Sequence, residues 1–561
     1  MKLNRLSPAF QFSVVAAAAI TLSAPAAFAR VTLKNGNFFR AYTDIGYKMG
    51  AEPKIERVYN SKTNYKGIFG PGWGNEYEVR LVASPDGSVV VQEYGGGAEN
   101  RFVPAQIQPG EIDEAVAKIA EQKRLTSAKA LEEYRAKLKG DALFRNEEWQ
   151  TLVNAGKLQA RAVPVGTKLT SNRFAYQILT RLKDGYQRSF DTGKVEKFDN
   201  SGRLVRVADK NGNSIDLTYS KDGRIEKLVD NMNRKMFFTF NTQGLVQKVQ
   251  GEGGAEASYK YNAQGELVES RDAEGNTYTY KYTTDGYHNL TEVGYSDKTT
   301  IQVAYFGTDK FMSVKSLKER DGTLNEYDYL LDPKDRGHLT VSTTLKDSDG
   351  KAVSRQKYEY FFKYKPDGEE WTYKLIQTND GEVTETVYNE CCGLPLLIKR
   401  GGEETAFVYD TKGRVVKKTT PSEVTELAYD AKAGKVAKVV KNSKLDKKFS
   451  SWSQFEYDDR GNLVFAKNSD KRGVKLFYDA TGRIKTMVDQ DRRRLDFKYD
   501  QNSRPVEIAD PKLGIIKVSY KAGGEIDKVD SAAGQKVALQ VTTAFQNLLE
   551  IIRPAGVSLS P

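Results

Sequence analysis

The chain has 561 residues, a length that a single compact domain seldom reaches unless its sequence repeats. Hydrophobic residues make up 39% and charged residues 29%, which excludes a disordered chain, and 31 Tyr and 25 Phe against 6 Met favour pleated sheet over helical cores. The formal charge of +12 predicts attraction to polyanions, but it is spread along a sequence without a nucleic-acid-binding motif, so we expect no specific nucleic-acid partner.

Residues 1–29 have the pattern of a bacterial Sec-type signal peptide. Lys2 and Arg5 form a positive region, residues 12–22 are apolar, and residues 27–29 (Ala-Phe-Ala) make a small-x-small cleavage site. The apolar stretch is too short for a membrane span. We therefore expect cleavage after Ala29 and export to the periplasm or outside the cell, with no membrane span. Loss of the two positive residues would leave a charge of +10 on the mature chain.

Residues 84–87 (Ser-Pro-Asp-Gly) and 95–102 predict successive hairpins early in the mature chain. Residues 111–160 then break the β pattern with apolar residues at helical spacing, namely Ile112, Val116, Ile119, Leu131, Tyr134 and Leu138. Thr126 or Ser127 is a suitable cap for a second helix, and Asp141 for a third that ends at Gly156. Two placements remain open: a helical insertion on the outside of the β structure, or a plug or lid at one of its ends.

An aromatic residue recurs every 21 residues in two parts of the chain, which is the strongest pattern in the sequence. The first series is Phe198, Tyr219, Phe240, Tyr261 and Tyr282, and the second is Tyr457, Tyr478, Tyr499 and Tyr520, with offset copies at Tyr409 and Tyr429. A glycine follows most of them four residues later: Gly202, Gly223, Gly244, Gly265, Gly286, Gly413, Gly461, Gly482 and Gly524. Such spacing predicts a structural unit of constant length.

Each unit has the residues of a β-hairpin. In residues 478–484 (Tyr-Asp-Ala-Thr-Gly-Arg-Ile), the aspartate can cap a type I turn and the glycine can adopt the left-handed conformation that ends it. The aromatic residue before the turn and the aliphatic residue after it then face each other across the hairpin. Because one hairpin cannot bury its face alone, we expect neighbours to add edge to edge into a long curling sheet.

This Tyr-Asp-x-x-Gly-Arg-hydrophobic pattern, present at 409–415 and 478–484, resembles the YD repeat of RHS proteins. The resemblance covers about residues 190–540 and is weak over 287–400. Gly70, Gly72 and Trp73 lie in a segment similar to the G-x-G-W segment that often precedes such repeats. The resemblance implies a strip of hairpins that spirals into a hollow shell, in some relatives around a toxin or another polypeptide.

The fold expected is therefore all-β: a strip of antiparallel β-hairpins that curls into a spiral shell or barrel-like sheet, with a small helical insertion. The predicted segments are a signal peptide (1–29), an N-terminal β domain (30–110), the helical insertion (111–160), a first repeat block (161–286), degenerate β repeats (287–400), a second repeat block (401–545) and a tail (546–561).

The C-terminal part departs from the RHS pattern. Full-length RHS toxins continue into a self-cleaving core with paired Asp-Pro motifs and then a toxin domain. Here the repeats run to about Val541, and residues 542–561 are too few for a toxin. Asp332-Pro333 and Asp510-Pro511 lack the rest of the cleavage motif. We expect a short relative without the self-cleaving core and without autocleavage.

The sequence offers little for catalysis. The two histidines, His288 and His338, lie in no catalytic or metal-binding motif, and no nucleotide-binding loop is present. A glycosidase needs two carboxylates, but most aspartates are accounted for by turns. Residues 209–216 have the oxygen spacing of a calcium loop without its bidentate glutamate, so we interpret them as a turn. We expect no enzymatic activity, no metal and no cofactor.

Cys391 and Cys392 are adjacent, and two thiols are not expected to stay free in an oxidising compartment. We favour a vicinal disulfide that makes a rigid turn between the degenerate repeats and the second block. The alternative is that each cysteine bonds another chain and dimerises the protein.

Two functions remain open. The first is an exported non-enzymatic scaffold that binds a protein or glycan of the cell envelope, for which exposed tyrosines interleaved with lysines are suitable. The second is a hollow shell that encloses a separately encoded polypeptide or toxin. An interior lined by apolar side chains would favour enclosure, whereas an open sheet with a flat aromatic face would favour display.

Overall fold

A computed structural model describes residues 30–531, apart from 48–49, 95–96, 108, 124–126, 172–176, 336, 367, 391, 447, 501–504, 511–513 and 521–525. The predicted signal peptide, Thr126, Cys391, Gly524 and the predicted tail lie outside the described residues. For Tyr520, the backbone alone is described.

A small antiparallel sheet comes first in the chain, with strand order β1-β2-β3-β6. We call it the inner sheet; its strands are β1 (Arg30–Thr32), β2 (Asn37–Gly46), β3 (Lys54–Asn60) and β6 (Trp73–Asn75). A two-stranded ribbon of β4 (Lys66–Gly67) and β5 (Gly70–Pro71) precedes β6, and the short helix η1 (Glu76–Glu78) follows it.

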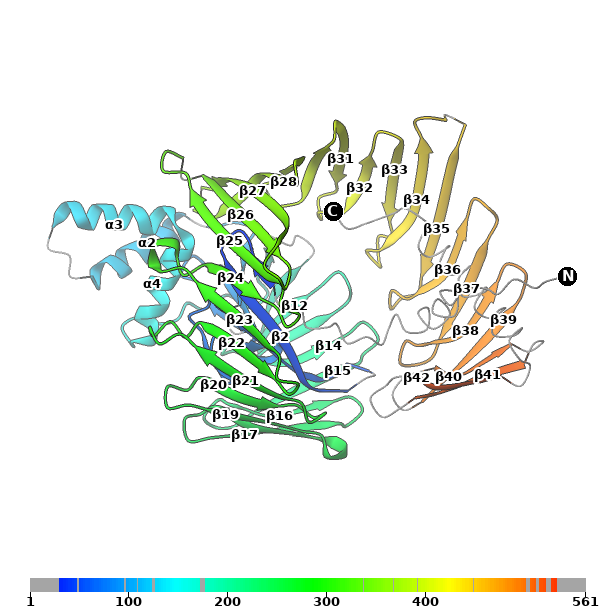
Figure 1. The fold of residues 1–561 in the computed structure, drawn as a ribbon, viewed down its shortest axis with the longest axis horizontal. Helices are drawn as coiled ribbons and strands as arrows, with labels where there is room; N and C mark the ends of the chain where they lie inside the picture. The colour runs from blue at the N-terminus through cyan, green and yellow to red at the C-terminus, as the bar shows by residue number, and fades with distance from the viewer. Residues whose placement is uncertain are drawn as a thin grey trace.

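Three α-helices interrupt the β structure: α2 (Pro109–Glu121), α3 (Ala128–Gly140) and α4 (Ala142–Asn154). The Ser127 hydroxyl accepts from Ala130 N, and the Asp141 carboxylate accepts from Phe144 N, so both helices begin at capping side chains. Trp149 and Leu152 are buried in a core that the helices build among themselves. The helices lie on the outside of the sheet (Figure 1), where Arg145 of α4 forms a buried ion pair with Asp86. None of the described helices combines the length and apolarity that crossing a membrane requires.

All later strands, and three before the helices, form one antiparallel strip in which each strand pairs with its neighbours in sequence. The first part consists of β7 (Arg80–Ala83), β8 (Val89–Glu93), β9 (Ala98–Pro104), β10 (Lys168–Ser171), β11 (Ile178–Leu182), β12 (Gly185–Ser189), β13 (Val195–Phe198), β14 (Leu204–Ala208), β15 (Ser214–Tyr219), β16 (Ile225–Asp230), β17 (Lys235–Phe240), β18 (Val246–Gly251), β19 (Glu256–Tyr261), β20 (Leu267–Arg271), β21 (Thr277–Tyr282), β22 (Leu290–Tyr295), β23 (Thr300–Tyr305) and β24 (Val314–Lys318). Two more short helices, η2 (Glu252–Gly254) and η3 (Thr308–Lys310), lie in its turns.

The strip continues through β25 (Leu324–Leu331), β26 (His338–Lys346), β27 (Ala352–Tyr364), β28 (Glu370–Asn379), β29 (Glu382–Tyr388), β30 (Pro395–Arg400), β31 (Glu403–Tyr409), β32 (Val415–Thr419), β33 (Glu423–Tyr429), β34 (Val436–Ser443), β35 (Ser450–Tyr457), β36 (Leu463–Asn468), β37 (Gly473–Tyr478), β38 (Ile484–Asp489), β39 (Arg494–Tyr499), β40 (Pro505–Asp510), β41 (Gly514–Tyr520) and β42 (Ile526–Ser531). The strip curls around the inner sheet (Figure 1), and its two ends are not paired with each other within the described residues. The predicted all-β strip of hairpins with a helical insertion is thus confirmed, and the sheet is open rather than closed.

The register of the strip changes in the same way at every repeat. A β-bulge occurs immediately before each predicted aromatic anchor, from Phe198 in the first block to Tyr520 in the second. The same bulge precedes Tyr305 and Tyr388, which the 21-residue spacing did not mark. Since bulges increase local twist, their regular recurrence contributes to the curl of the strip.

One ladder of contacts joins each repeat to the next. Asp479 Oδ1 accepts from the backbone N–H groups of Thr481 and Arg483, and Asp479 Oδ2 accepts from Arg483 Nε at 2.6 Å. The guanidinium of Arg483 lies 4.9 Å from the ring centroid of Tyr499, one repeat later. The Tyr499 hydroxyl then donates to the carbonyl of Ile484 at 2.7 Å. Within each turn, the glycine has the positive φ that the position needs, 85° at Gly482.

The tyrosine hydroxyl is the part of this ladder that phenylalanine cannot supply. The same hydroxyl-to-carbonyl bond, at 2.6–3.0 Å, is made by Tyr219, Tyr261, Tyr282, Tyr305, Tyr409, Tyr429, Tyr457, Tyr478 and Tyr499. The anchor position therefore contributes a hydrogen bond between repeats as well as apolar area.

The inner sheet is locked into the first block by a fully buried ion pair. Arg57 of β3 donates to both carboxylate oxygens of Asp44 on β2, and the two side chains have no exposed area. The strip surrounds this pair: Ser270 accepts from Arg57 Nη2 at 2.9 Å, and the Tyr259 hydroxyl donates to Asp44 Oδ2 at 2.8 Å. The Arg57 guanidinium also faces the rings of Tyr42, Trp73, Tyr259 and Tyr280 at 4.9–5.8 Å.

The buried pair predicts a large and asymmetric loss of stability. Asp44→Asn leaves the Arg57 charge buried without its counter-ion, so we expect the free energy of unfolding to fall by about 3–5 kcal/mol. Replacing both partners by apolar residues, Asp44→Leu with Arg57→Met, should cost less because no charge remains buried. Urea unfolding followed by tyrosine fluorescence measures both values, and an unchanged midpoint for Asp44→Asn would contradict the central role of the pair.

The ladder predicts a smaller cost per repeat. Tyr478→Phe removes one hydroxyl-to-carbonyl bond while keeping the ring, so unfolding of the second block should become easier by about 1 kcal/mol. Tyr287→Phe is a suitable control because Tyr287 is 56% exposed. Equal urea midpoints for the two variants would show that the hydroxyl adds nothing to the ring.

Candidate functional site

The strip has two faces that differ in composition. The anchor aromatics lie on the inner face, the one that contacts the inner sheet in the first block, because Tyr280 and Tyr282 of β21 pack there against Trp73. Side chains alternate between the two faces along a strand, and directly paired residues of neighbouring strands lie on the same face. The inner face can therefore be followed from strand to strand through the whole strip. Tyr329 pairs with Val341, Tyr358 with Gln377, and Phe455 with Ala466 on the same side.

In the first block, the inner face is occupied by the chain itself. The predicted Gly70, Gly72 and Trp73 motif lies at this contact. A Cβ on Gly70 would come within 2.5 Å of the carbonyl of the turn residue Gly265, and one on Gly72 within 2.6 Å of the Tyr59 ring. Trp73, fully buried, donates its indole N–H to the Tyr282 hydroxyl at 2.9 Å. The two glycines therefore allow the close approach that brings Trp73 against the strip.

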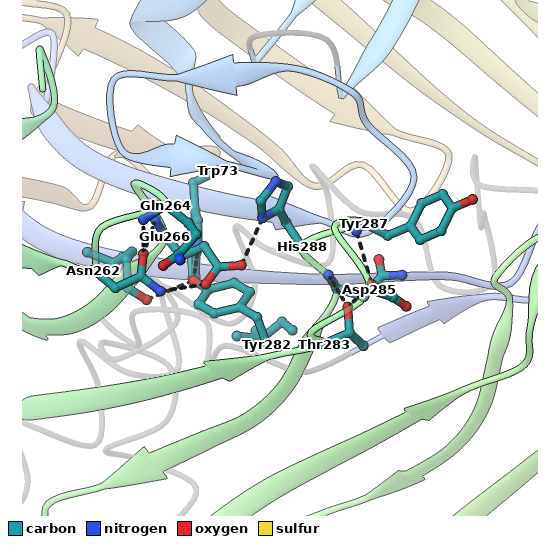
Figure 2. A network of polar contacts seen from close by, with 12 residues as sticks. Trp73, Asn262, Gln264, Glu266, Tyr282, Thr283, Asp285, Tyr287 and His288 are labelled. Atoms are coloured by element: carbon teal, nitrogen blue, oxygen red, sulfur yellow. Dashed lines mark hydrogen bonds and ion pairs between the residues drawn. The ribbon is translucent and has the colours of Figure 1, made fainter.

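A polar network at the edge of this contact contains one of the two histidines (Figure 2). His288 Nδ1 lies 2.8 Å from Glu266 Oε1, and the other carboxylate oxygen accepts from the Asn262 amide at 2.6 Å. The backbone of His288 has φ 56°, and its carbonyl accepts from the Tyr59 hydroxyl of the inner sheet. These partners are a carboxylate, an amide and the main chain, which fits a contact that joins two turns to the inner sheet.

In the second block, the inner face is apolar. Its buried cluster consists of Leu427, Val439, Phe455, Ala466, Val474, Leu476, Met487, Leu495 and Ile516, with Tyr457, Tyr478, Ile484, Phe497, Ile508 and Val518 packed around it. In the described part of the chain, no helix or second sheet is placed over these residues as the inner sheet is over the first block (Figure 1). The side chains at the centre of this cluster are nevertheless buried: Ala466 is 0% and Leu495 2% exposed.

Between the blocks, the inner face is aromatic and half-buried. Tyr358, Tyr360 and Phe362 of β27 follow each other on it, and the rings of Tyr360 and Phe362 stack at 6.2 Å. Burial raises the pKa of the Tyr360 hydroxyl to about 12. Lys34 of the inner-sheet region extends to this surface, where its ammonium lies 4.6 Å from the Phe362 ring and pairs with Glu370 at 3.0 Å.

The outer face of β26–β28 has a row of rings that the repeat pattern does not predict. His338 stacks on Phe361 at 4.4 Å, Phe361 contacts Tyr373 at 6.2 Å, and Tyr373 contacts Trp371 at 6.3 Å. Lys374 lies 4.2 Å over the Phe361 ring, and Lys363 lies 4.7 Å over the Tyr373 ring. We call His338, Phe361, Tyr373 and Trp371 the outer ring row.

Cys392 lies in a repeat turn. Tyr388 precedes Asn389, and the Asn389 side-chain oxygen accepts from the backbone of Cys392 and Leu394, as the aspartate of other turns does. Cys392 is disulfide-bonded, and Cys391 lies outside the described residues, so their pairing with each other stays a prediction. Asn389 and Gly393 were the signal that identifies this unit, displaced by one residue from the usual spacing.

Residues 209–213 form a turn, with Asp209 Oδ1 accepting from the backbone N–H groups of Asn211 and Asn213. Among the described residues, no three His, Cys, Asp or Glu side chains gather in a way that would hold a metal ion.

Family models match two parts of the chain. The model described as RHS Repeat matches residues 240–300, and one described as a domain of unknown function (DUF6531) matches residues 29–102. The second range contains the inner sheet and the Gly70-to-Trp73 motif. Comparison with curated proteins finds no match.

Solved structures that the chain matches include chains of two Tc toxin assemblies. The chain is 12% identical to one from the Photorhabdus luminescens Tc holotoxin pore, over 90% of this chain and 28% of that one, with a TM-score of 0.38. It is 11% identical to a chain of the TcdB2-TccC3-Cdc42 crystal structure, over 88% and 29%, with a TM-score of 0.39. A porin-like protein from Bacteroides uniformis is 10% identical over 44% and 91%, with a TM-score of 0.16.

This chain thus spans less than a third of the length of the two Tc chains, and such low TM-scores do not support a transfer of function. The family rests instead on the matched repeat segment and on the anchor pattern that the structure extends from Phe198 to Tyr520. On these grounds, the chain is an RHS-repeat protein.

Proposed function

We propose that this protein is an exported, non-enzymatic β-repeat scaffold that holds a polypeptide partner along the inner face of its second block. The observation that carries the proposal is the contrast between the two blocks. The first block has its inner face filled by the inner sheet, whereas the apolar side chains on the inner face of the second block are buried although no described helix or second sheet packs over them. Apolar area of this extent, once it is accessible, is typical of sites where another polypeptide packs.

The chemistry of the surface favours a polypeptide with apolar side chains. The cluster around Phe455, Leu476 and Leu495 is apolar, and the neighbouring anchor hydroxyls of Tyr478 and Tyr499 are already bonded to carbonyls of the strip. Such a surface offers apolar packing rather than directional polar contacts. We therefore expect it to bind polypeptides rich in apolar side chains without requiring one particular sequence.

Two phenylalanines on opposite faces of the second block provide a matched test. Phe497 lies on the inner face of β39, and Phe477 is 51% exposed on the outer face of β37. The probe is dye-labelled, reduced and carboxymethylated α-lactalbumin, a permanently unfolded polypeptide, followed by fluorescence anisotropy. Phe497→Ser should weaken binding about tenfold, as expected for loss of one central aromatic contact, and Phe477→Ser should leave it unchanged.

Folded α-lactalbumin is the control ligand and should not bind. Absence of binding by the unfolded probe, or equal affinities of the Phe497→Ser and Phe477→Ser proteins, would contradict an inner-face site.

The outer ring row supports a second candidate function, binding of an acidic envelope glycan. Its half-buried rings offer aromatic surface to sugars, and Lys363 and Lys374 lie over two of the rings and would attract carboxylates. Polygalacturonate should bind in isothermal titration calorimetry, while neutral dextran should not. Trp371→Ala should weaken the binding of polygalacturonate about tenfold and Phe477→Ala should not. If poly-glutamate binds as tightly as polygalacturonate, charge alone is responsible and the glycan site is wrong.

A further inference from the structure

The two blocks of the strip touch each other at a contact that the hydrogen-bonded pairing of neighbouring strands does not require. The turn 209–213 between β14 and β15 meets the turns 458–462 and 479–482 of the second block. Lys210 Nζ donates to the carbonyl of Gly461 at 2.9 Å, and the Asn462 amide donates to Asn211 Oδ1 at 3.3 Å. We call this contact the seam. Each of the two bonds joins residues that are 251 positions apart in the sequence.

The seam brings opposite edges of the strip together. Residues 209–213 belong to the edge with the second turn of each repeat, whereas 458–462 and 479–482 belong to the edge with the Tyr-Asp turns. The approach is close, since a Cβ on Gly482 would lie 2.4 Å from the Asn211 amide. The curl of the strip has therefore advanced far enough for one block to dock against the other.

The positive charge of Lys435 works against the contact at the seam. Lys210 faces Lys435 from the turn before β34, while Asp458 and Asp209 face it from the two turns in contact. Burial, and then the charge of Lys435, lower the pKa of Lys210 to about 8. Since the docked state favours neutral Lys210, docking is strongest at high pH and weakens as the pH falls toward 8, below which the weakening is complete.

The part of the strip between the blocks is suited to bending. Most side chains of β27 and β28 are half-buried, on both faces. The core clusters of the two blocks do not include residues from these strands. A single layer without such a core resists bending less than the first block, which encloses the inner sheet.

We propose that the seam is a latch that holds the two blocks together and that its release exposes the inner face of the second block. The latch regulates the polypeptide site and in that respect rests on the proposed function. The docking and release of the blocks is a property of the chain alone and can be measured without a partner.

The latch is tested by distance measurements on the full mature chain. Thr192 and Ala480 are exposed and lie in turns on the two sides of the seam, so spin labels on Thr192→Cys and Ala480→Cys report its separation in double electron–electron resonance. Asn211→Ala removes the side-chain bond to Asn462 across the seam but keeps the bond from the backbone N–H of residue 211 to Asp209. This variant should add a population at longer distance. Lys435→Gln removes the opposing charge and should narrow the distribution at the short distance.

Two further variants separate the latch from general loosening. Raising the pH from neutrality to about 10 should shift the parent protein toward the short distance, and Lys210→Met should abolish this shift, because the titrating group is gone. Lys221→Met changes an exposed lysine in a turn outside the seam and should behave like the parent. Distance distributions that are identical in the parent, Asn211→Ala and Lys435→Gln proteins would overturn the latch.

The link to binding is measured separately with the unfolded α-lactalbumin probe. Its association rate should be about tenfold higher for Asn211→Ala than for Lys435→Gln, because the rate scales with the open fraction. If the distances respond but no variant binds the probe, the polypeptide site is wrong and the latch stands. If the probe binds at equal rates although the distances respond, the seam does not control access and the regulatory inference is overturned.

Discussion

The structure depends on the hydrogen bond between each anchor tyrosine hydroxyl and a carbonyl of the preceding repeat. A 21-residue hairpin has too little area to bury a face on its own, so its stability has to come from its neighbour. The bond from Tyr499 to Ile484, with Arg483 lying over the Tyr499 ring and tied to Asp479, supplies that connection from four motif positions at once. The residues of the Tyr-Asp-x-x-Gly-Arg pattern thus form the turn and also make the contact with the neighbouring repeat.

The inner sheet adds a second layer to the first block. The contacts between repeats do not provide such a layer, because they lie within the strip. Arg57 and Asp44 are taken fully out of water, a costly arrangement to which Ser270, Tyr259 and Tyr280 of the strip add compensating hydrogen bonds. Those three residues are contributed by strands β19 to β21, so the pair gains these hydrogen bonds only when the strip has curled around it. The buried charges therefore help to specify where the curl begins, and they leave the second block with a different environment.

Much of the strip was predictable, because a repeat of constant length leaves a periodic signal. The aromatic and glycine spacing identified the hairpins, and the fold class is confirmed. Tyr305 and Tyr388 were missed, since the turn lengths before them shift the spacing. The inner-sheet lock, the outer ring row and the seam could not be predicted, because each joins residues whose proximity depends on the path of the strip. The position of the helical insertion stayed open between two alternatives for the same reason. Its amphipathic pattern indicates that one side of each helix is buried, but it does not indicate which part of the protein covers that side.

The bulge before each anchor has a consequence for copy number. Because bulges increase local twist, the turn that meets residues 209–213 depends on how many hairpins lie between them and the second block. Gain or loss of one hairpin in that interval would present a different turn, displaced along the strip, and the lysine and asparagine pairs would no longer coincide. The contact therefore constrains the number of hairpins between its two sides more than it constrains the identity of single residues within those hairpins.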